Sequence, residues 1–293
     1  MSFFYGVTKK RSYFEGWYFK NQNVSEIISL IPSLHIDEIG KKFVIIQVII
    51  NSSSYQIKYK MDEFSILKKG LGIRIGNNTF TDKGISLDIC TDCIEVVGKL
   101  IYTSFVPLKY DIMGPFKYAP FMQCRHSVYS LAHNIKGHLL VNGNHIDFNN
   151  GLGYVEGDRG VEFPSNYFWT QCSWRNNGNN VVMLSVADIP IGRLKFMGCI
   201  GIVYYGGKEY RLATYLGVKI RKNNSQELWV QQRGYDLKAI VIDENPHSLL
   251  APVKGNMTRT VHESIDCKMR YCFVVYGKVI FDFVGRGSFE RGK

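Results

Sequence analysis

Residues 16–36 read GWYFKNQNVSEIISLIPSLHI, and residues 166–189 read NYFWTQCSWRNNGNNVVMLSVADI. Each stretch begins with an aromatic segment, passes through an Asn-rich turn and continues as an aliphatic segment. Alternating residues bounded by turn residues predict a pair of β-strands in each stretch. Further strand patterns follow both stretches, so this faint repeat predicts two similar β-rich halves, residues 1–160 and residues 161–293.

Short alternating segments recur along the whole chain, and helical periodicity is nearly absent. Two tight hairpins are explicit, because Asn142-Gly143 and Gly206-Gly207 separate strand patterns and both pairs tolerate positive φ angles. Aromatic residues make up 14% of the chain, and they suit the half-buried surface of a sheet. The predicted fold class is therefore all-β, an antiparallel barrel or sandwich.

The chain has 293 residues and a formal net charge of +11, which gives it a basic surface. Such a surface attracts nucleic acid or anionic lipid, or simply favours solubility. The basic residues are scattered and no nucleic-acid-binding motif accompanies them, so we expect no nucleic-acid partner. A weak peripheral contact with anionic membranes stays open.

Three features of the sequence predict a cytoplasmic protein. The first residues lack the apolar core of a signal peptide. The longest aliphatic stretch, FVIIQVII at 43–50, is too short to cross a bilayer. The seven cysteines are odd in number and irregularly spaced, which does not fit a disulfide framework.

Residues 13–20 read YFEGWYFK and place Glu15 among five aromatic rings. In a strand, Glu15 shares its face with Trp17. Residues 151–160 repeat this feature, because a strand there carries Glu156 beside a tyrosine. Each such face is either a polar-rimmed surface or an apolar chamber that contains an acid.

Two sets of potential metal ligands are better explained without a metal. Cys90-x-x-Cys93 lacks a second pair at suitable spacing, so we interpret it as coincidence. His138 and His145 point away from the apolar face of the Asn142-Gly143 hairpin, and His138 lies opposite Asp147 as an ordinary cross-strand pair. We therefore predict neither a metal site nor a cofactor.

Six sequence blocks, which cover roughly the first 60% of the chain, resemble the tocopherol cyclase family and occur in the order found in that family. They are FEGWYFK at 14–20, DIMGPF at 111–116, HSVYSL at 126–131, VNGNHIDF at 141–148, GYVEGDRG at 153–160 and FPSNYFWTQCSW at 163–174. The family usually has Asp-Trp-Gly where this chain has Asp158-Arg159-Gly160. By strand parity Arg159 lies opposite the Glu156 face, so the chemistry could survive while the substrate differs.

The resemblance, which extends more distantly to carotenoid hydratases, implies two consecutive lipocalin-like antiparallel β-barrel halves with an apolar, aromatic cavity. It also implies a cofactor-free enzyme that acts on a prenylated aromatic substrate. Family members close the chromanol ring of tocopherols from a phytyl-quinol, an intramolecular lyase or isomerase reaction.

Ring closure requires an acid that protonates an alkene, and aromatic faces that stabilise the resulting cation. Burial in an apolar pocket raises the pKa of a carboxyl group and keeps it neutral. Glu156 and Glu15 are the first candidates for the catalytic acid, followed by Asp158; in the related hydratases a Tyr-x-Asp acid motif matches Tyr154-x-Glu156. The expected substrate-binding residues are Tyr154, Trp17 and Trp169 around the cation, with Gln171 or His126 orienting the quinol oxygen.

A structural interpretation of these residues stays open. Buried carboxylates often belong to ion pairs, and Gly16 and Trp17 could simply close the floor of a barrel. A different function also stays open, in which the same cavity carries a prenylquinone, a fatty acid or another lipid without transforming it. An enzyme would lose turnover on a Glu156→Gln or Glu15→Gln change, whereas a carrier would tolerate either.

Overall fold

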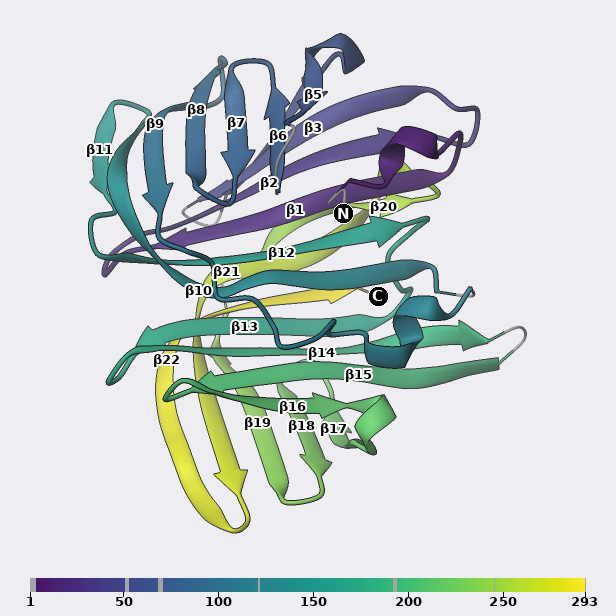
Figure 1. Ribbon diagram of the computed structural model, residues 1–293, viewed down its shortest axis with the longest axis vertical. Helices are drawn as coiled ribbons and strands as arrows, with labels where there is room; N and C mark the ends of the chain where they lie inside the picture. Colours follow the sequence, from purple (N-terminus) through teal and green to yellow (C-terminus); the bar gives the residue numbers. More distant parts are fainter. Residues whose placement is uncertain are drawn as a thin grey trace. The chain divides into compact units, whose positions relative to one another are not determined.

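The computed structural model describes residues 4–50, 53–67, 71–120, 122–191, 194–244 and 246–292. Among these residues, the strands form two antiparallel sheets, one of twelve strands and one of ten (Figure 1). The helical segments are short 3₁₀ turns: η1 (Gly6–Thr8), η2 (Met61–Glu63), η3 (Gly114–Tyr118) and η4 (Thr214–Leu216). The all-β prediction is confirmed.

The first sheet comprises the strands β1 (Tyr13–Gln22), β2 (Ile27–Ile36), β3 (Lys42–Ile50), β4 (Ser53–Tyr59), β5 (Phe64–Ile66), β6 (Gly72–Ile75), β7 (Asn78–Thr81), β8 (Gly84–Cys90), β9 (Glu95–Tyr102), β10 (Cys124–Val141), β11 (Asn144–Asp147) and β12 (Gly151–Gly160). Their order in the sheet is β4-β3-β2-β1-β12-β10-β9-β8-β7-β6-β5, and β11 pairs with β10.

The second sheet comprises the strands β13 (Tyr167–Arg175), β14 (Asn179–Ile191), β15 (Leu194–Tyr205), β16 (Lys208–Ala213), β17 (Lys219–Asn223), β18 (Glu227–Gln232), β19 (Tyr235–Asp243), β20 (His247–Val253), β21 (Asn256–Val275) and β22 (Lys278–Gly292). Their order is β16-β15-β14-β13-β22-β21-β19-β18-β17, and β20 pairs with β21.

The first and last strands of the two sheets are paired in the same way. In each, the first strand (β1 or β13) lies between the second strand and the last strand (β12 or β22). The stretches at 16–36 and 166–189 form the equivalent hairpins β1–β2 and β13–β14. The faint repeat in the sequence therefore corresponds to a repeated sheet topology.

The chain forms two compact units. The first consists of Met1–Lys109, His126–Phe163 and Ala251–Arg259, and the second of Tyr110–Arg125, Pro164–Leu250 and Thr260–Lys293. Each unit has its own apolar core, with Trp17, Phe19 and Val155 in the first and Phe168 and Tyr271 in the second. The division at residue 160 stays a prediction.

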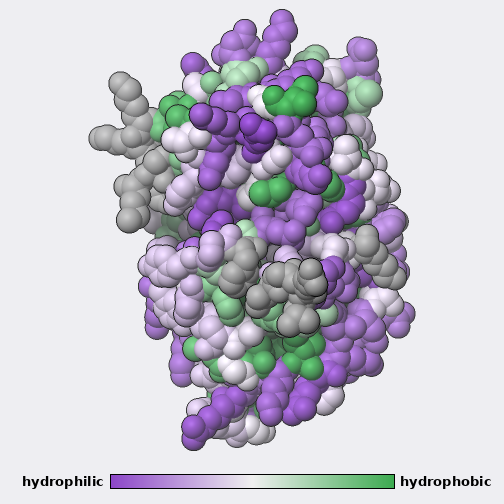
Figure 2. Space-filling model, turned by 90° about the vertical axis from the view of Figure 1, so that its right-hand side faces the viewer, coloured by the Kyte–Doolittle hydropathy of each residue, from purple (hydrophilic) through white to green (hydrophobic). Residues whose placement is uncertain are grey.

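Both hairpins that the sequence made explicit are present. Asn142 and Gly143 have φ angles of 47° and 78° between β10 and β11, and Gly206-Gly207 connects β15 to β16. His138 lies opposite Asp147, as predicted, and is exposed. Figure 2 shows hydrophilic side chains over much of one face of the molecule, with hydrophobic groups between them.

Cys90 and Cys93 are exposed free thiols at the end of β8 and in the turn after it. Of the helical segments in the described residues, none has the length and apolar character that crossing a membrane requires.

Candidate functional site

Three neighbouring strands of the first sheet, β1, β12 and β10, carry most of the residues singled out in the sequence. In an antiparallel pair, residues directly opposite each other share a face, and the next residue along each strand points to the other face. Glu15 lies opposite Arg159, and Tyr18 lies opposite Glu156. The two leading candidate acids therefore lie on opposite faces of one sheet.

The face of Glu15 is the one that packs on the core of the first unit. Trp17 follows two residues later on β1 and belongs to the core cluster, as does Val155 on β12. Glu156 and Asp158 are on the other face because they alternate with Val155. Arg159 lies opposite the Glu156 face, as strand parity predicted, and the pairing of β1 with β12 puts it on the face of Glu15.

Glu15 anchors the segment before the first strand. Its Oε2 accepts hydrogen bonds from the backbone amides of Tyr5 and Gly6, both at 2.9 Å, and from the phenol of Tyr13 at 3.0 Å. Gly6 begins η1, so this carboxylate satisfies amides at the start of a 3₁₀ turn. Two backbone donors fix the carboxylate in a way that suits a structural anchor.

The positive charge of Arg159 lies near Glu15 and also helps to hold the segment before β1. Burial raises the pKa of Glu15 above its ordinary value, although the hydrogen bonds and the charge of Arg159 oppose this effect. The Arg159 guanidinium lies over the ring of Tyr5, 4.1 Å from its centroid, and donates to Ser127 at 3.2 Å. Arg159 thereby ties the segment before β1 to β10 and β12.

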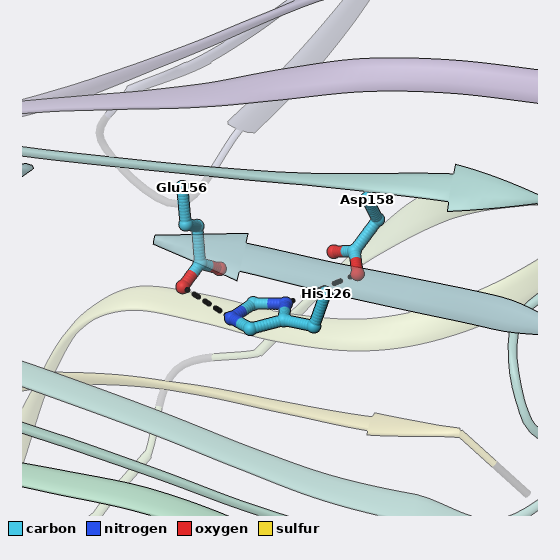
Figure 3. Close-up of side chains that lie close together, drawn as sticks. All are labelled: His126, Glu156 and Asp158. Carbon is cyan, nitrogen blue, oxygen red and sulfur yellow. Dashed lines mark hydrogen bonds and ion pairs between the residues drawn. The ribbon is translucent and has the colours of Figure 1, made fainter. Parts of the chain in front are cut away.

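On the opposite face, the imidazole of His126 lies between two carboxylates (Figure 3). His126 Nδ1 is 3.0 Å from Asp158 Oδ1 in a hydrogen bond. His126 Nε2 is 3.3 Å from Glu156 Oε2, an ion-pair contact that is not aligned as a hydrogen bond. The phenol of Tyr154 donates to the same Glu156 oxygen at 2.6 Å. We call these four residues the His126 cluster.

The His126 cluster is largely removed from water. The exposed fractions of the side chains are 11% for His126, 7% for Glu156 and 25% for Asp158. Burial alone would lower the pKa of His126, but the charges of Asp158 and Glu156 and the hydrogen bond to Asp158 raise it well above its ordinary value. The ring is therefore an imidazolium at neutral pH.

Tyr154 acts as a hydrogen-bond donor within this cluster. Burial raises the pKa of the Tyr154 phenol well above its ordinary value, and the charge of Glu156 and the hydrogen bond to it act in the same direction. The phenol consequently keeps its proton and directs it at Glu156. The arrangement stores one exchangeable proton between the buried carboxylate of Glu156 and the partly buried carboxylate of Asp158.

Two residues of β1 on this face were not singled out from the sequence. Tyr18 lies directly opposite Glu156, and Ser29 of β2 donates a hydrogen bond to its phenol at 2.9 Å. Lys20 is only 1% exposed and lies opposite Tyr154 and Ser29. Alternation along β1 puts Tyr18 and Lys20 on the face away from Glu15, but it does not reveal that β1 pairs with β12.

The other predicted substrate-binding residues are distributed over different parts of the fold. Trp17 is buried in the core and stacks on Phe4 with ring centroids 5.9 Å apart. Trp169 and Gln171 are buried on β13 in the second unit, where Gln171 donates to Ser173 at 2.7 Å. The structure brings His126, Tyr154 and both acids of β12 together, whereas Glu15 and Trp17 belong to the other face.

The His126 cluster also contains the ligand types of a metal site. One atom each from His126, Glu156 and Asp158 lie within 4.8 Å of one another. A metal would need these atoms about 2.0–2.2 Å from one point. The two ring nitrogens instead point to different carboxylates, so an ion bound to one nitrogen would lose the carboxylate on the other side (Figure 3). The observed geometry suits a proton better than a metal ion.

No protein-family model matches the sequence, and no curated protein matches it. Solved structures do resemble it. An AttH-like protein of Nitrosomonas europaea gives a TM-score of 0.56 at 9% identity, with 95% of this chain and 92% of that one covered. Kievitone hydratase of Nectria haematococca gives 0.53 at 13% identity, with 99% and 92% covered. These similarities show a shared fold of two consecutive lipocalin-like halves.

Proposed function

We propose that the protein is an intramolecular cyclase that acts on a prenylated phenol or quinol by protonating a prenyl double bond. The observation that carries this proposal is the buried His126 cluster, in which an imidazolium and a phenol both contact Glu156. An alkene is a weak base, so its protonation requires an acid shielded from water and a nearby proton reserve. The resemblance of the sequence to tocopherol cyclases supports the same chemistry.

In the proposed reaction, the His126 imidazolium passes its proton to Glu156, which gives it to the less substituted alkene carbon. The π electrons form the new C–H bond and leave a tertiary cation, which the phenolic oxygen attacks to form the C–O bond. The phenol proton returns to the Glu156 carboxylate, so the product is an isomer of the substrate. His126 holds the proton between turnovers, and Asp158 fixes its ring.

The fold comparison supports a related group of reactions. One structural neighbour is named a hydratase, and hydration of an alkene starts with the same proton transfer. The two outcomes differ in what captures the cation, since water gives a hydrated product and an internal phenol gives a ring. We favour ring closure because the sequence blocks resemble cyclases.

The test is incubation of the purified protein with a panel of prenylated quinols, without added cofactor, followed by mass-resolved chromatography. We expect an isomer of unchanged mass. Glu156→Gln should lower turnover at least about 100-fold, because it removes the acid but keeps the shape. Binding of the substrate, measured by fluorescence quenching, should persist in this variant.

Glu15→Gln is the matched control, since Glu15 is equally buried but lies on the core face. Turnover should persist in Glu15→Gln, because an amide oxygen still accepts the bonds from Tyr5 and Gly6. Loss of turnover in this control alone would reject Glu156 as the acid. A product heavier by one water would identify a hydratase, and binding without any product in all variants would identify a lipid carrier.

A further inference from the structure

The segment between β9 and β10 displays aromatic side chains at the surface of the second unit. Tyr118, in η3, is 79% exposed, and Tyr110 is half exposed. Phe116 of the same segment contacts Phe196 of β15, with ring centroids 6.1 Å apart. Leu216 of η4 is also exposed. We call these residues the aromatic patch.

The backbone beneath the patch is held in place by two side chains of the second unit. Arg211 of β16 donates to the carbonyl oxygens of Tyr110 and Asp111, both at 2.8 Å. Tyr215 donates to the carbonyl oxygen of Ile112 at 3.0 Å, and its ring packs against Gly114. The patch therefore rests on a fixed support.

A third side chain holds the end of this segment. Arg125 donates to the carbonyl oxygens of Lys117 and Ala119, at 3.4 and 3.0 Å. The backbone thus bonds inward while the side chain of Tyr118 extends outward. The Tyr118 ring is therefore presented to solvent on a fixed backbone, where an external partner can reach it.

The charges beside the patch indicate what that partner is. The Lys117 ammonium lies 4.9 Å from the ring centroid of Tyr118. Lys195 of β15 and Lys219 of β17 are exposed lysines of the second unit. The whole chain carries a net charge of +11. In Figure 2 hydrophobic surface is bordered by hydrophilic side chains on the side that η3 and η4 occupy in Figure 1.

We propose that the aromatic patch docks on the surface of an anionic lipid membrane. Tyrosine suits the boundary between headgroups and acyl chains, because its ring is apolar and its hydroxyl is polar. Lysines beside it gain about 1 kcal/mol each near an anionic leaflet, which corresponds to about fivefold in binding. The docking is peripheral and reversible, and it does not depend on the proposed cyclase activity.

The test is co-sedimentation of the whole protein with vesicles at low salt. One set consists of phosphatidylcholine alone, and the other also contains phosphatidylglycerol. We expect binding to the anionic vesicles and much weaker binding to the neutral ones. Lys117→Glu should weaken the anionic binding at least about fivefold, and Tyr118→Ser should weaken it severalfold because less apolar surface is buried.

Tyr276→Ser is the matched control, because Tyr276 is 78% exposed but lies in the turn between β21 and β22. Its vesicle binding should equal that of the unchanged protein. Equal weakening by Tyr276→Ser and Tyr118→Ser, or no binding to anionic vesicles, would overturn the proposal. A dimer in sedimentation velocity that Tyr118→Ser dissociates would also overturn it, since a second copy would then cover the patch.

Discussion

Glu15 and Glu156 lie on neighbouring strands and are both almost fully buried, yet their partners differ in kind. Glu15 accepts two backbone amides and the phenol of Tyr13. Glu156 contacts the imidazolium of His126 and the phenol of Tyr154. Backbone amides hold a carboxylate in place but cannot exchange protons with it, whereas an imidazolium can. Burial in an apolar setting is therefore insufficient to identify a catalytic acid.

The histidines of β10 repeat this contrast between the two faces. His126 is held as a cation by carboxylates on the face that carries Glu156, which we call the outer face. His133, seven residues later, is on the core face, where its Nδ1 is 3.0 Å from Ser130 Oγ and its ring packs against Tyr102. Burial lowers the pKa of His133 to about 3, so this ring is neutral. The buried histidine of the core face is therefore neutral, whereas that of the outer face is charged.

The largest effect expected from this contrast concerns two glycines. A Cβ at Gly153 would lie 2.0 Å from His133 Nε2, on the tightly packed core face. A Cβ at Gly16, on the outer face, would lie 3.0 Å from its nearest neighbour, Ser33 Cβ. Gly153→Ala should cost about 3 kcal/mol of unfolding free energy, and Gly16→Ala about 1 kcal/mol or less. Urea denaturation measures both losses of unfolding free energy, provided that the m-value is unchanged. Equal losses for the two variants would contradict the difference in packing.

A smaller effect is expected from the two tyrosines that donate to the glutamates. Tyr154→Phe removes a hydrogen bond to Glu156 and should lower turnover about tenfold, since a bond to a charged group contributes about 1.5–3 kcal/mol. Tyr13→Phe leaves Glu15 with its two amide donors, so it should cost about 1 kcal/mol of stability without changing turnover. Steady-state kinetics on the panel of quinols, beside thermal unfolding, separates the two outcomes. Equal loss of turnover in both variants would remove the distinction between the faces.

The smallest and most local effect is the titration of the two histidines, measured by proton–nitrogen NMR of the rings. Because the folded pKa of His126 is raised, its contribution to stability is complete below about pH 6.5 and is lost as pH rises through the folded pKa. His133, with a folded pKa of about 3, takes up no proton in the native state above that pH. Its burial therefore destabilises the fold progressively as pH falls below about 6.5. If both rings titrated near pH 6.5, the raised pKa of His126 and the lowered pKa of His133 would be contradicted.

Much of the fold could be predicted from the sequence because it depends on local patterns. Alternation predicted β1 and β12, and Asn142-Gly143 predicted a hairpin whose register puts His138 opposite Asp147. Parity also placed Arg159 and Glu156 on different faces. These features depend on residues that are close in the chain, or on the two-residue period of a strand.

The arrangement of the candidate site was harder to predict from the sequence, because it depends on the pairing of strands that are distant in the chain. Glu15 and Glu156 shared the same sequence signal, a carboxylate beside aromatic rings. Only the pairing of β1 with β12 shows that they lie on opposite faces. The position of His126 between Glu156 and Asp158 requires β10 to lie beside β12, and His126 and Asp158 are 32 residues apart in the chain. Single-sequence patterns do not contain such pairings.

The pairing of β1 with β12 also affects how a ribosome can produce this protein. Phe14 pairs with Gly160, so one edge of β1 stays open until most of the first half has been synthesised. The first unit further includes Ala251–Arg259, whose Gly255 amide donates to the carbonyl oxygen of Val161. About 95 residues separate that segment's end from Phe163, which takes roughly 5–20 s of translation at ~5–20 residues per second. The first unit therefore lacks its last segment for seconds after β12 has been synthesised, an interval in which chaperones can protect it.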